Sequence, residues 1–370
     1  MKVAVLGSGA YGLSLALMFN ENNVDITIWT KFDEEKEMLL KYHENKNTLK
    51  GVILPDNFKY TTDMKEAVDG ASLILIAVPA GFVDDVSREL RHYITRDQHV
   101  CIGSKGIEQD TCLFVTDVFK KYIKTSKLAV ISGPSFAVDI AAKIPIGLSL
   151  GTKNKETALL LKETLQNNTL KLRPTKDILG IEICGSIKNV IAIAAGMLDG
   201  MGMPESTQAM FITESLNDIK NLIRALGGSK KTILSFAGFG DILLTCTSKK
   251  SRNFTYGYMI GSGASKKEID EYLDKTTVEG LYTLKSIYKL LDNKKVNMPI
   301  INLIYNIIFN DYDPHKLLQF LIEKYSLCAI LLSFLNSQYH FFLILIFGLE
   351  KFLFQLLIPF EFYQLCIFLQ

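Results

Sequence analysis

An excess of charge of either sign is absent from this sequence. Lysine and arginine together number 41 and the acidic residues 39, which gives a formal net charge of +2. Such a balance provides no long-range field that would recruit nucleic acid or an anionic membrane surface. Any bound anion must therefore be held by local contacts, and we expect no nucleic-acid partner.

Closely paired cysteines are also absent. The chain has six cysteines, none in a CxxC spacing, and most lie in apolar runs, where a thiol behaves as a small hydrophobic side chain. We therefore expect neither a disulfide framework nor a metal site. At the N-terminus a strand-like run starts directly after Lys2, without the charged and apolar regions of a secretion signal. We expect a cytoplasmic, reducing location.

The sequence does contain a glycine motif near its start. The segment KVAVLGSGAYGLSLALMFNENNVDITIW reads as strand, glycine turn, helix and second strand, with Gly7, Gly9 and Gly12 in the pattern GxGxxG. The first glycine permits a tight turn, the second lets a pyrophosphate approach the backbone, and the third lets helix and strand pack closely. The phosphates then lie at the helix N-terminus. This context predicts a dinucleotide-binding unit.

Two domains are predicted from the 370 residues, of which 48% are hydrophobic. Continuous apolar runs at 73–79, 99–104, 128–133 and 146–151 are typical of buried strands in a mostly parallel sheet. From about Asp177 onward the pattern becomes helical. We predict an α/β fold, with a doubly wound Rossmann domain at 1–178 and an all-helical domain at 179–324.

The choice between NAD and NADP stays open at this stage. After the second strand the sequence reads WTKFDEE, so Lys31 precedes Asp33 and Glu34. An acid at this point accepts the ribose hydroxyls of NAD, whereas a basic residue accommodates the 2′-phosphate of NADP.

Three further loops carry candidate ligand contacts. Lys105 lies between glycines after a predicted strand, where ligands of such sheets bind, although it also reads as a solvated loop lysine. In SGPSFAVDIA (132–141), Ser135 is suited to cap the following helix. In SFAGFGDILLTCTSKKSRNF (235–254), a glycine-rich turn leads to Asp241, and Ser251, Arg252 and Asn253 could hold a phosphate or merely cap a helix.

These motifs together resemble the bacterial-type, soluble NAD(P)-dependent glycerol-3-phosphate dehydrogenases. GSGAYG, GSKGIE, SGPSFA, EICGSIKNVIAIAAG, GFGDILLTCTSKKSRN and TVEG occur in the family's order, and the resemblance covers residues 1 to about 324. It implies interconversion of sn-glycerol 3-phosphate and dihydroxyacetone phosphate, which supplies phospholipid synthesis. It also implies a helical domain like that of 6-phosphogluconate dehydrogenases and a homodimer.

The resemblance assigns the lysine in the apolar segment 182–196 a catalytic role. Lys188 matches the family's acid/base and Lys105 its second lysine, which contacts substrate and cofactor. A lysine held in an apolar helix beside another cation is disfavoured in its charged form, so its proton comes within reach of chemistry near neutral pH. Ala192, Ala195 and Gly196 follow on roughly the same face, where we expect them to leave room for the lysine side chain.

The remaining roles are also implied by the resemblance. Tyr11 stands where many relatives have tryptophan. Asp241 matches an acid that hydrogen-bonds the substrate side and orients Lys188. Substrate contacts match Lys105, Gly133, Ser135, Lys188, Asp241, Ser251, Arg252 and Asn253, and cofactor contacts match Gly7, Gly9, Ala10, Tyr11, Gly12, Lys31, Lys105, Ala137, Arg252, Thr277 and Glu279.

Residues 325–370 do not fit this pattern. The run 325–349 contains no Asp, Glu, Lys or Arg, and at ~1.5 Å per residue it could cross a bilayer of about 30 Å, but NSQYH (336–340) interrupts it. A membrane-associating helix, a buried or partner-binding extension and a reading-frame artefact compete. The abrupt change in composition favours the artefact, and membrane contact is expected only if the tail is genuine.

Two other functions compete with the resemblance. A β-hydroxyacid dehydrogenase would share the cofactor turn and a helical lysine, but the Ser-Arg-Asn loop makes little sense for an unphosphorylated acid. A non-catalytic nucleotide-binding redox sensor would have structural lysines and no turnover.

Overall fold

The computed structural model describes residues 1–323, so the atypical tail at 325–370 lies outside the described residues. Residues Met1–Leu317 form one compact unit, and a second unit begins at Leu318. The strands are β1 (Lys2–Leu6), β2 (Asp25–Trp29), β3 (Lys59–Thr61), β4 (Leu73–Ile76), β5 (His99–Ile102), β6 (Leu128–Ser132), β7 (Ile146–Thr152) and β8 (Leu170–Thr175).

These strands form a single sheet in the order β3-β2-β1-β4-β5-β6-β7-β8. All neighbouring pairs are parallel except β6 and β7, which run antiparallel. The order reverses at β1 and β4, as in a doubly wound Rossmann sheet, where ligands bind at the carboxyl ends of the strands. The four predicted apolar runs are β4, β5, β6 and β7, and the Rossmann prediction is confirmed.

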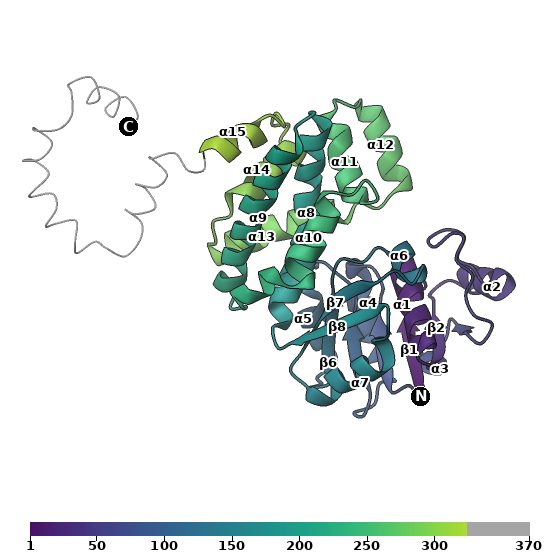
Figure 1. Cartoon of the computed structure of the whole chain (residues 1–370). Coiled ribbons are helices and arrows are strands. Elements are labelled where there is room, and N and C mark those ends of the chain that lie inside the picture. Colours follow the sequence, from purple (N-terminus) through teal and green to yellow (C-terminus); the bar gives the residue numbers. More distant parts are fainter. Residues whose placement is uncertain (324–370) are drawn as a thin grey trace, which may run out of the picture. The chain divides into compact units, whose positions relative to one another are not determined.

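Helices of the first half connect and cover the strands (Figure 1). They are α1 (Ala10–Glu21), α2 (Asp33–Tyr42), α3 (Met64–Val68), η1 (Ala80–Phe82), α4 (Val83–Leu90), α5 (Val115–Lys120), α6 (Ala137–Ala141) and α7 (Lys155–Leu165).

The second half is helical after β8, as predicted. Its elements are α8 (Ile178–Gly200), α9 (Glu205–Ala225), η2 (Lys230–Leu234), η3 (Phe236–Gly240), α10 (Asp241–Cys246), α11 (Arg252–Gly261), α12 (Lys266–Lys275), α13 (Glu279–Lys294), α14 (Pro299–Phe309) and α15 (Lys316–Glu323).

Helix α8 is the centre of the helical part. Among the described helices it alone is long and apolar enough to cross a membrane, but 83% of its most apolar window is buried inside the protein. Its apolar residues pack against α9, α10, α11 and α13. The apolarity of α8 is therefore explained by its place in the protein core.

Helices α8 and α11 approach each other through glycines. A Cβ added at Gly196 would lie 2.0 Å from the carbonyl oxygen of Phe254, and one added at Gly257 would lie 1.8 Å from that of Ile193. Gly200 and Gly261 make equivalent approaches one turn further on. The prediction that Gly196 leaves room for the lysine side chain is wrong, because this glycine makes room for the backbone of α11.

Candidate active site

The glycine turn joins β1 to α1 in the geometry that a dinucleotide requires. Gly7 has a φ of 120°, and a Cβ there would lie 2.9 Å from the carbonyl oxygen of Ala77. A Cβ on Gly12 would lie 2.6 Å from the carbonyl oxygen of Gly7, whereas one on Gly9 would meet nothing within 4 Å. The turn is closely packed at Gly7 and Gly12 and open at Gly9, so it fits a pyrophosphate at the start of α1.

Lys105 lies on the loop that follows β5. Its ammonium lies 5.5 Å from the ring centroid of Tyr11, and the ring of Tyr11 packs close to Gly103. The second residue of α1 and the loop after β5 are therefore neighbours. This arrangement brings the predicted cofactor contact Tyr11 beside the predicted second lysine.

Asp241 is delivered by a distorted turn. The segment Phe236–Gly240 forms a single π-helical turn in which Gly238 departs from helical angles, with ψ of −106°. A Cβ at Gly238 would lie 2.3 Å from the carbonyl oxygen of Ile233. The hydroxyl of Ser149, on β7, accepts a hydrogen bond from the amide of Ala237 at 3.1 Å. Turns of this kind occur often at functional sites, and this one is anchored to the sheet.

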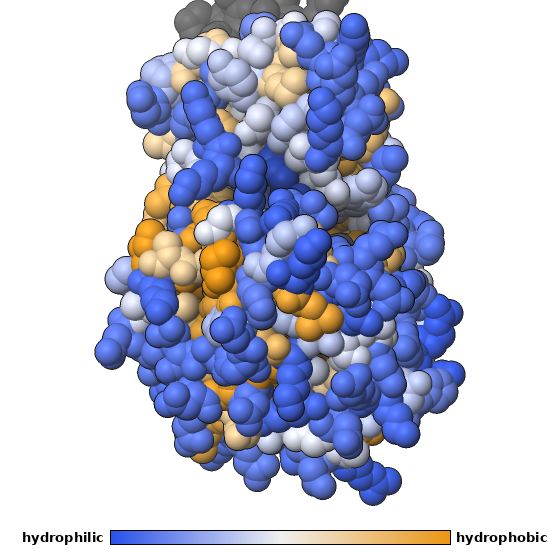
Figure 2. All heavy atoms as spheres, turned by 90° about the vertical axis from the view of Figure 1, so that its right-hand side faces the viewer, coloured by the Kyte–Doolittle hydropathy of each residue, from blue (hydrophilic) through white to orange (hydrophobic). Residues whose placement is uncertain are grey.

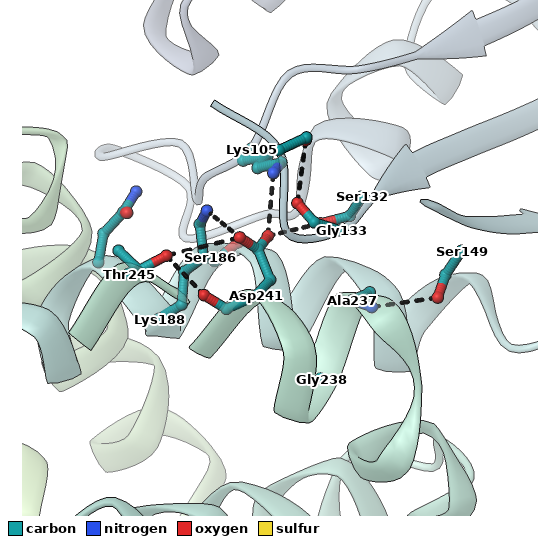
Figure 3. A network of polar contacts seen from close by, with 12 residues as sticks. Lys105, Ser132, Gly133, Ser149, Ser186, Lys188, Ala237, Gly238, Asp241 and Thr245 are labelled. Atoms are coloured by element: carbon teal, nitrogen blue, oxygen red, sulfur yellow. Dashed lines mark hydrogen bonds and ion pairs between the residues drawn. The ribbon is translucent and has the colours of Figure 1, made fainter. Parts of the chain in front are cut away.

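The two predicted lysines meet on this carboxylate (Figure 3). The Lys188 ammonium lies 2.6 Å from Oδ1 of Asp241, and the Lys105 ammonium lies 3.0 Å from Oδ2. Asp241 is 1% exposed, and the two lysine side chains are 12% and 15% exposed. Three groups that are far apart in sequence thus form one ion-pair cluster between the sheet and α8.

Burial and charge act in opposite directions on these groups. Burial lowers the pKa of Lys188, Asp241 opposes this, and the charge of Lys105 adds to the lowering. Burial alone would raise the pKa of Asp241, but the two lysines hold it below its ordinary value. The aspartate therefore stays ionised, while Lys188 releases its proton more readily than an exposed lysine.

Two further residues complete the surroundings of Asp241, and the sequence analysis missed both. The hydroxyl of Ser132, at the end of β6, donates to Oδ2 at 3.4 Å, and that of Thr245 lies 3.5 Å from Oδ1. Thr245 stands four residues after Asp241 on α10, and this spacing was a signal that could have identified it. No sequence pattern could have identified Ser132, because only the fold brings the end of β6 beside Asp241.

The predicted phosphate loop lies at the start of α11. Ser251 is the N-cap and accepts the amide of Phe254 at 3.3 Å. The side chain of Asn253 accepts the amide of Gly280 at 2.8 Å. Asn189, next to Lys188 on α8, donates to Glu279 at 3.2 Å. Asn253 and Glu279 are thus brought together at the start of α13, close to Lys188.

Other predicted residues lie around this centre. The carbonyl of Ala137, at the start of α6, accepts a hydrogen bond from Ser14 of α1 at 2.7 Å. This bond places α6 against the helix that also carries Ala10. Arg252, Thr277 and Lys31 are exposed, and none of the three makes a side-chain contact with the lysine cluster among the described residues.

The expected cap by Ser135 is wrong. Helix α6 begins at Ala137 with Phe136 at its N-cap position and no side-chain cap. The hydroxyl of Ser135 instead donates to the carbonyl oxygen of Gly133 at 3.1 Å, so it stabilises the turn before the helix.

A hollow in the surface marks the region between the sheet and the helices. Figure 2 shows hydrophilic residues over most of this face and around the hollow between its upper and lower parts. Lys250, in the loop before α11, pairs with Asp139 of α6 at 3.1 Å, so an ion pair joins the helical half of the chain to the half that contains the sheet. The loop that precedes α11 therefore lies beside α6.

Comparison with known proteins identifies relatives over nearly the whole described chain. Sequence models described as the N-terminus and the C-terminus of NAD-dependent glycerol-3-phosphate dehydrogenase match residues 2–158 and 177–319. A glycerol-3-phosphate dehydrogenase (NAD(P)+) of Staphylococcus epidermidis is 34% identical over 326 residues, which are 87% of this chain and 98% of the relative. The corresponding Fusobacterium nucleatum protein is 35% identical over 84% of this chain and 93% of its own.

A solved structure supports the same grouping. The crystal structure of glycerol-3-phosphate dehydrogenase from Coxiella burnetii matches with a TM-score of 0.81 and 30% identity, and the match covers 87% of this chain and 98% of that one.

Proposed function

Because the chain belongs to the family of NAD-dependent glycerol-3-phosphate dehydrogenases, we propose that it interconverts sn-glycerol 3-phosphate and dihydroxyacetone phosphate with NAD or NADP. The observation that carries the proposal is the cluster in which Asp241 holds Lys188 and Lys105 at 2.6 and 3.0 Å. Its product would supply phospholipid synthesis.

The cluster suits proton transfer to a ketone oxygen. The nicotinamide, when bound, supplies the hydride that reduces the carbonyl carbon. As charge develops on the oxygen, a nearby ammonium stabilises it and a group of suitable pKa donates the proton. Lys188, with its pKa lowered by burial, is the proton donor in this proposal. Lys105 supplies the second positive charge, and Asp241 fixes the position of both ammonium groups.

The substrate phosphate is assigned to the start of α11. Ser251 and Asn253 are buried there, Arg252 is exposed beside them, and the helix N-terminus adds backbone donors. Gly133 and Ser135 would contact the substrate from the opposite loop. Asn189, which follows Lys188 on α8, donates a hydrogen bond to Glu279 at the start of α13. This contact links the catalytic helix to the proposed phosphate region.

The cofactor is assigned to the glycine turn and the loops around it. The contacts are those of Gly7, Gly9, Ala10, Tyr11, Gly12, Lys31, Lys105, Ala137, Arg252, Thr277 and Glu279. We propose a cofactor domain at 1–178 and a substrate domain at 179–324, which agrees with the end of β8 at Thr175 and the start of α8 at Ile178.

Turnover with and without phosphate tests the activity. Purified protein with NADH or NADPH should oxidise the cofactor in the presence of dihydroxyacetone phosphate but not of unphosphorylated dihydroxyacetone, followed by nicotinamide absorbance. Equal rates with both ketones would contradict the phosphate site and point to a β-hydroxyacid type of enzyme. Cofactor binding without any oxidation would indicate a sensor.

The role of Lys188 has a separate test. Lys188→Ala should lower kcat by about a hundredfold or more, because a positioned acid contributes that much, while cofactor affinity stays nearly unchanged. Lys162→Ala, an exposed lysine on α7, is the matched control and should turn over normally. A Lys188→Ala enzyme with normal kcat would contradict the assigned role.

We also propose a cytoplasmic location and a homodimer, which rest on the resemblance to the family. Sedimentation of the purified protein tests the dimer, since a monomer at working concentration would contradict it.

A further inference from the structure

The structure identifies an acid beside the glycine turn that was not singled out from the sequence. Glu35, in the first turn of α2, accepts hydrogen bonds on Oε2 from the hydroxyl of Thr30 at 2.6 Å and from that of Ser8. Ser8 lies inside the glycine motif, and Thr30 directly follows β2. Both are buried, at 5% and 2% exposed. The carboxylate of Glu35 therefore connects the glycine turn to the end of the second strand.

The backbone around this carboxylate is held firmly. The amide of Gly7 donates to the carbonyl of Trp29, the last residue of β2, at 2.9 Å. The side chain of Asn45, which is 1% exposed, donates to the carbonyl of Ser8 at 2.9 Å. The turn, the strand end and Glu35 thus form one rigid corner. Two hydroxyl donors fix the direction of the carboxylate within that corner.

This corner is where the adenosine ribose of a dinucleotide lies when its pyrophosphate occupies the glycine turn. Oε2 of Glu35 is used by Ser8 and Thr30, while Oε1 accepts no hydrogen bond from the described residues. A carboxylate oxygen accepts hydroxyl protons, and a ribose offers them. The geometry therefore provides an acceptor for a ribose hydroxyl at the required place.

The neighbouring acids do not take this position. Asp33 points toward the end of β3, where it accepts from Thr62 at 3.0 Å and pairs with Lys36 at 3.2 Å. Glu34 is exposed and makes no side-chain contact among the described residues. Lys36, the cation next to Glu35 in sequence, pairs with Asp33 and with Glu37, at 3.2 and 3.9 Å. Lys31 is exposed and has no ion pair in the described part of the chain.

We infer that Glu35 makes NADH rather than NADPH the cofactor of this protein, by accepting a ribose hydroxyl and repelling a 2′-phosphate. The inference rests on the proposed binding of a nicotinamide dinucleotide. A 2′-phosphate placed at this corner meets a fixed carboxylate at contact distance. The attraction of an exposed lysine such as Lys31 is weak by comparison, because water and salt screen it.

Binding of both cofactors to the full chain tests the inference without relying on turnover. Trp29 is the only tryptophan of the sequence and ends β2 at this corner, so quenching of its fluorescence reports the dissociation constant. We expect NADH to bind at least about tenfold more tightly than NADPH. Glu35→Gln should reduce the ratio of the NADPH and NADH dissociation constants to near unity, mainly because NADPH binds more tightly. The ratio of kcat/KM for the two cofactors should change in the same direction.

Glu34→Gln is the matched control, since it removes the same charge one residue away, from a side chain in solvent. It should leave the ratio of the NADPH and NADH dissociation constants within about twofold of the wild-type value. Circular dichroism checks that each variant folds, and the wild-type ratio alone tests the preference if Glu35→Gln does not fold.

Equal or tighter wild-type binding of NADPH overturns the inference and leaves the proposed dehydrogenase activity standing. An unchanged ratio in a folded Glu35→Gln protein overturns it as well. Preferential binding of NADH without oxidation by dihydroxyacetone phosphate supports the inference on Glu35 and contradicts the proposed activity alone.

Discussion

The carboxylate of Asp241 is the residue on which the site depends most. It is buried at 1% exposure and neutralises one of the two ammonium charges that it contacts. Without it, Lys188 and Lys105 would face each other with no counter-charge, and the charged form of Lys188 would be more strongly disfavoured. One aspartate thus sets both the position and the acidity of the proposed proton donor.

We predict that Asp241→Asn lowers kcat for ketone reduction by about a hundredfold. Reduction needs Lys188 protonated, so activity is lost as pH rises through the pKa of Lys188. Asparagine removes the charge that raises this pKa, and the loss should therefore occur at lower pH than in the wild type. The pH profiles of kcat for both proteins check this. If kcat fell at the same pH in both proteins, Asp241 would not be responsible for the pKa of Lys188.

Glu182 gives a second prediction, on stability. Burial raises its pKa to about 7, although the amide and hydroxyl of Thr116 donate to it at 2.9 and 2.8 Å. Because the folded pKa lies above the unfolded one, the stabilising contribution is complete below the unfolded pKa and is lost as pH rises through about 7. The loss amounts to about 3 kcal/mol above that range.

Urea unfolding at several pH values measures this effect. The wild type should lose stability between about pH 4.5 and pH 7. Glu182→Gln should lose less, because a neutral amide replaces the carboxyl group. Glu163→Gln, on the exposed side of α7, serves as the control and should follow the wild type. Parallel curves for wild type and Glu182→Gln would exclude Glu182 as the titrating group.

The site residues that could be identified from the sequence are those that lie within a recognisable motif. Lys105, Lys188 and Asp241 each lie in a segment with a family pattern, and the structure brings them together. Ser132 and Glu35 were missed because their roles depend on which strand and turn lie opposite. Glu182 was not singled out from the sequence, because its partner Thr116 is brought to it only by the fold.

At the scale of elements, the contact between α8 and α11 depends on backbone approach. Gly257→Ala should lower the free energy of unfolding by about 3 kcal/mol, because a Cβ would lie 1.8 Å from the carbonyl oxygen of Ile193 and the helices must move apart. Chemical denaturation measures the loss. Gly81→Ala, where a Cβ meets nothing within 4 Å, is the control. Equal stability of the two variants would argue against the tight contact.

The predicted elements were those with strong apolar patterns. Strands β4 to β7 were visible as continuous runs, since both faces of the sheet are covered. Strands β3 and β8 were missed: the first has only three residues, and the second alternates buried and exposed positions and contains Pro174, as an edge strand can. The antiparallel direction of β7 was not predictable, because direction depends on the connection and not on composition.

At the scale of the whole molecule, the residues after 324 are predicted to be dispensable. The family match ends at residue 319, and the Staphylococcus epidermidis relative is matched over 98% of its length by 87% of this chain. A protein ending at residue 324 should keep kcat/KM within about twofold and be at least as soluble. Activity and solubility of the two lengths check this, and loss of folding on truncation would contradict it.

The glycine contact between α8 and α11 has a consequence for substrate choice. Helix α8 carries Lys188, α11 begins at Ser251, and the four glycines let the two backbones touch. Under the proposed roles, the separation of proton donor and phosphate site is set by main-chain contact, which side-chain rotation cannot adjust. These glycines would then fix the distance between proton donor and phosphate site. Only a substrate whose ketone and phosphate are separated by a carbon chain of matching length could reach both.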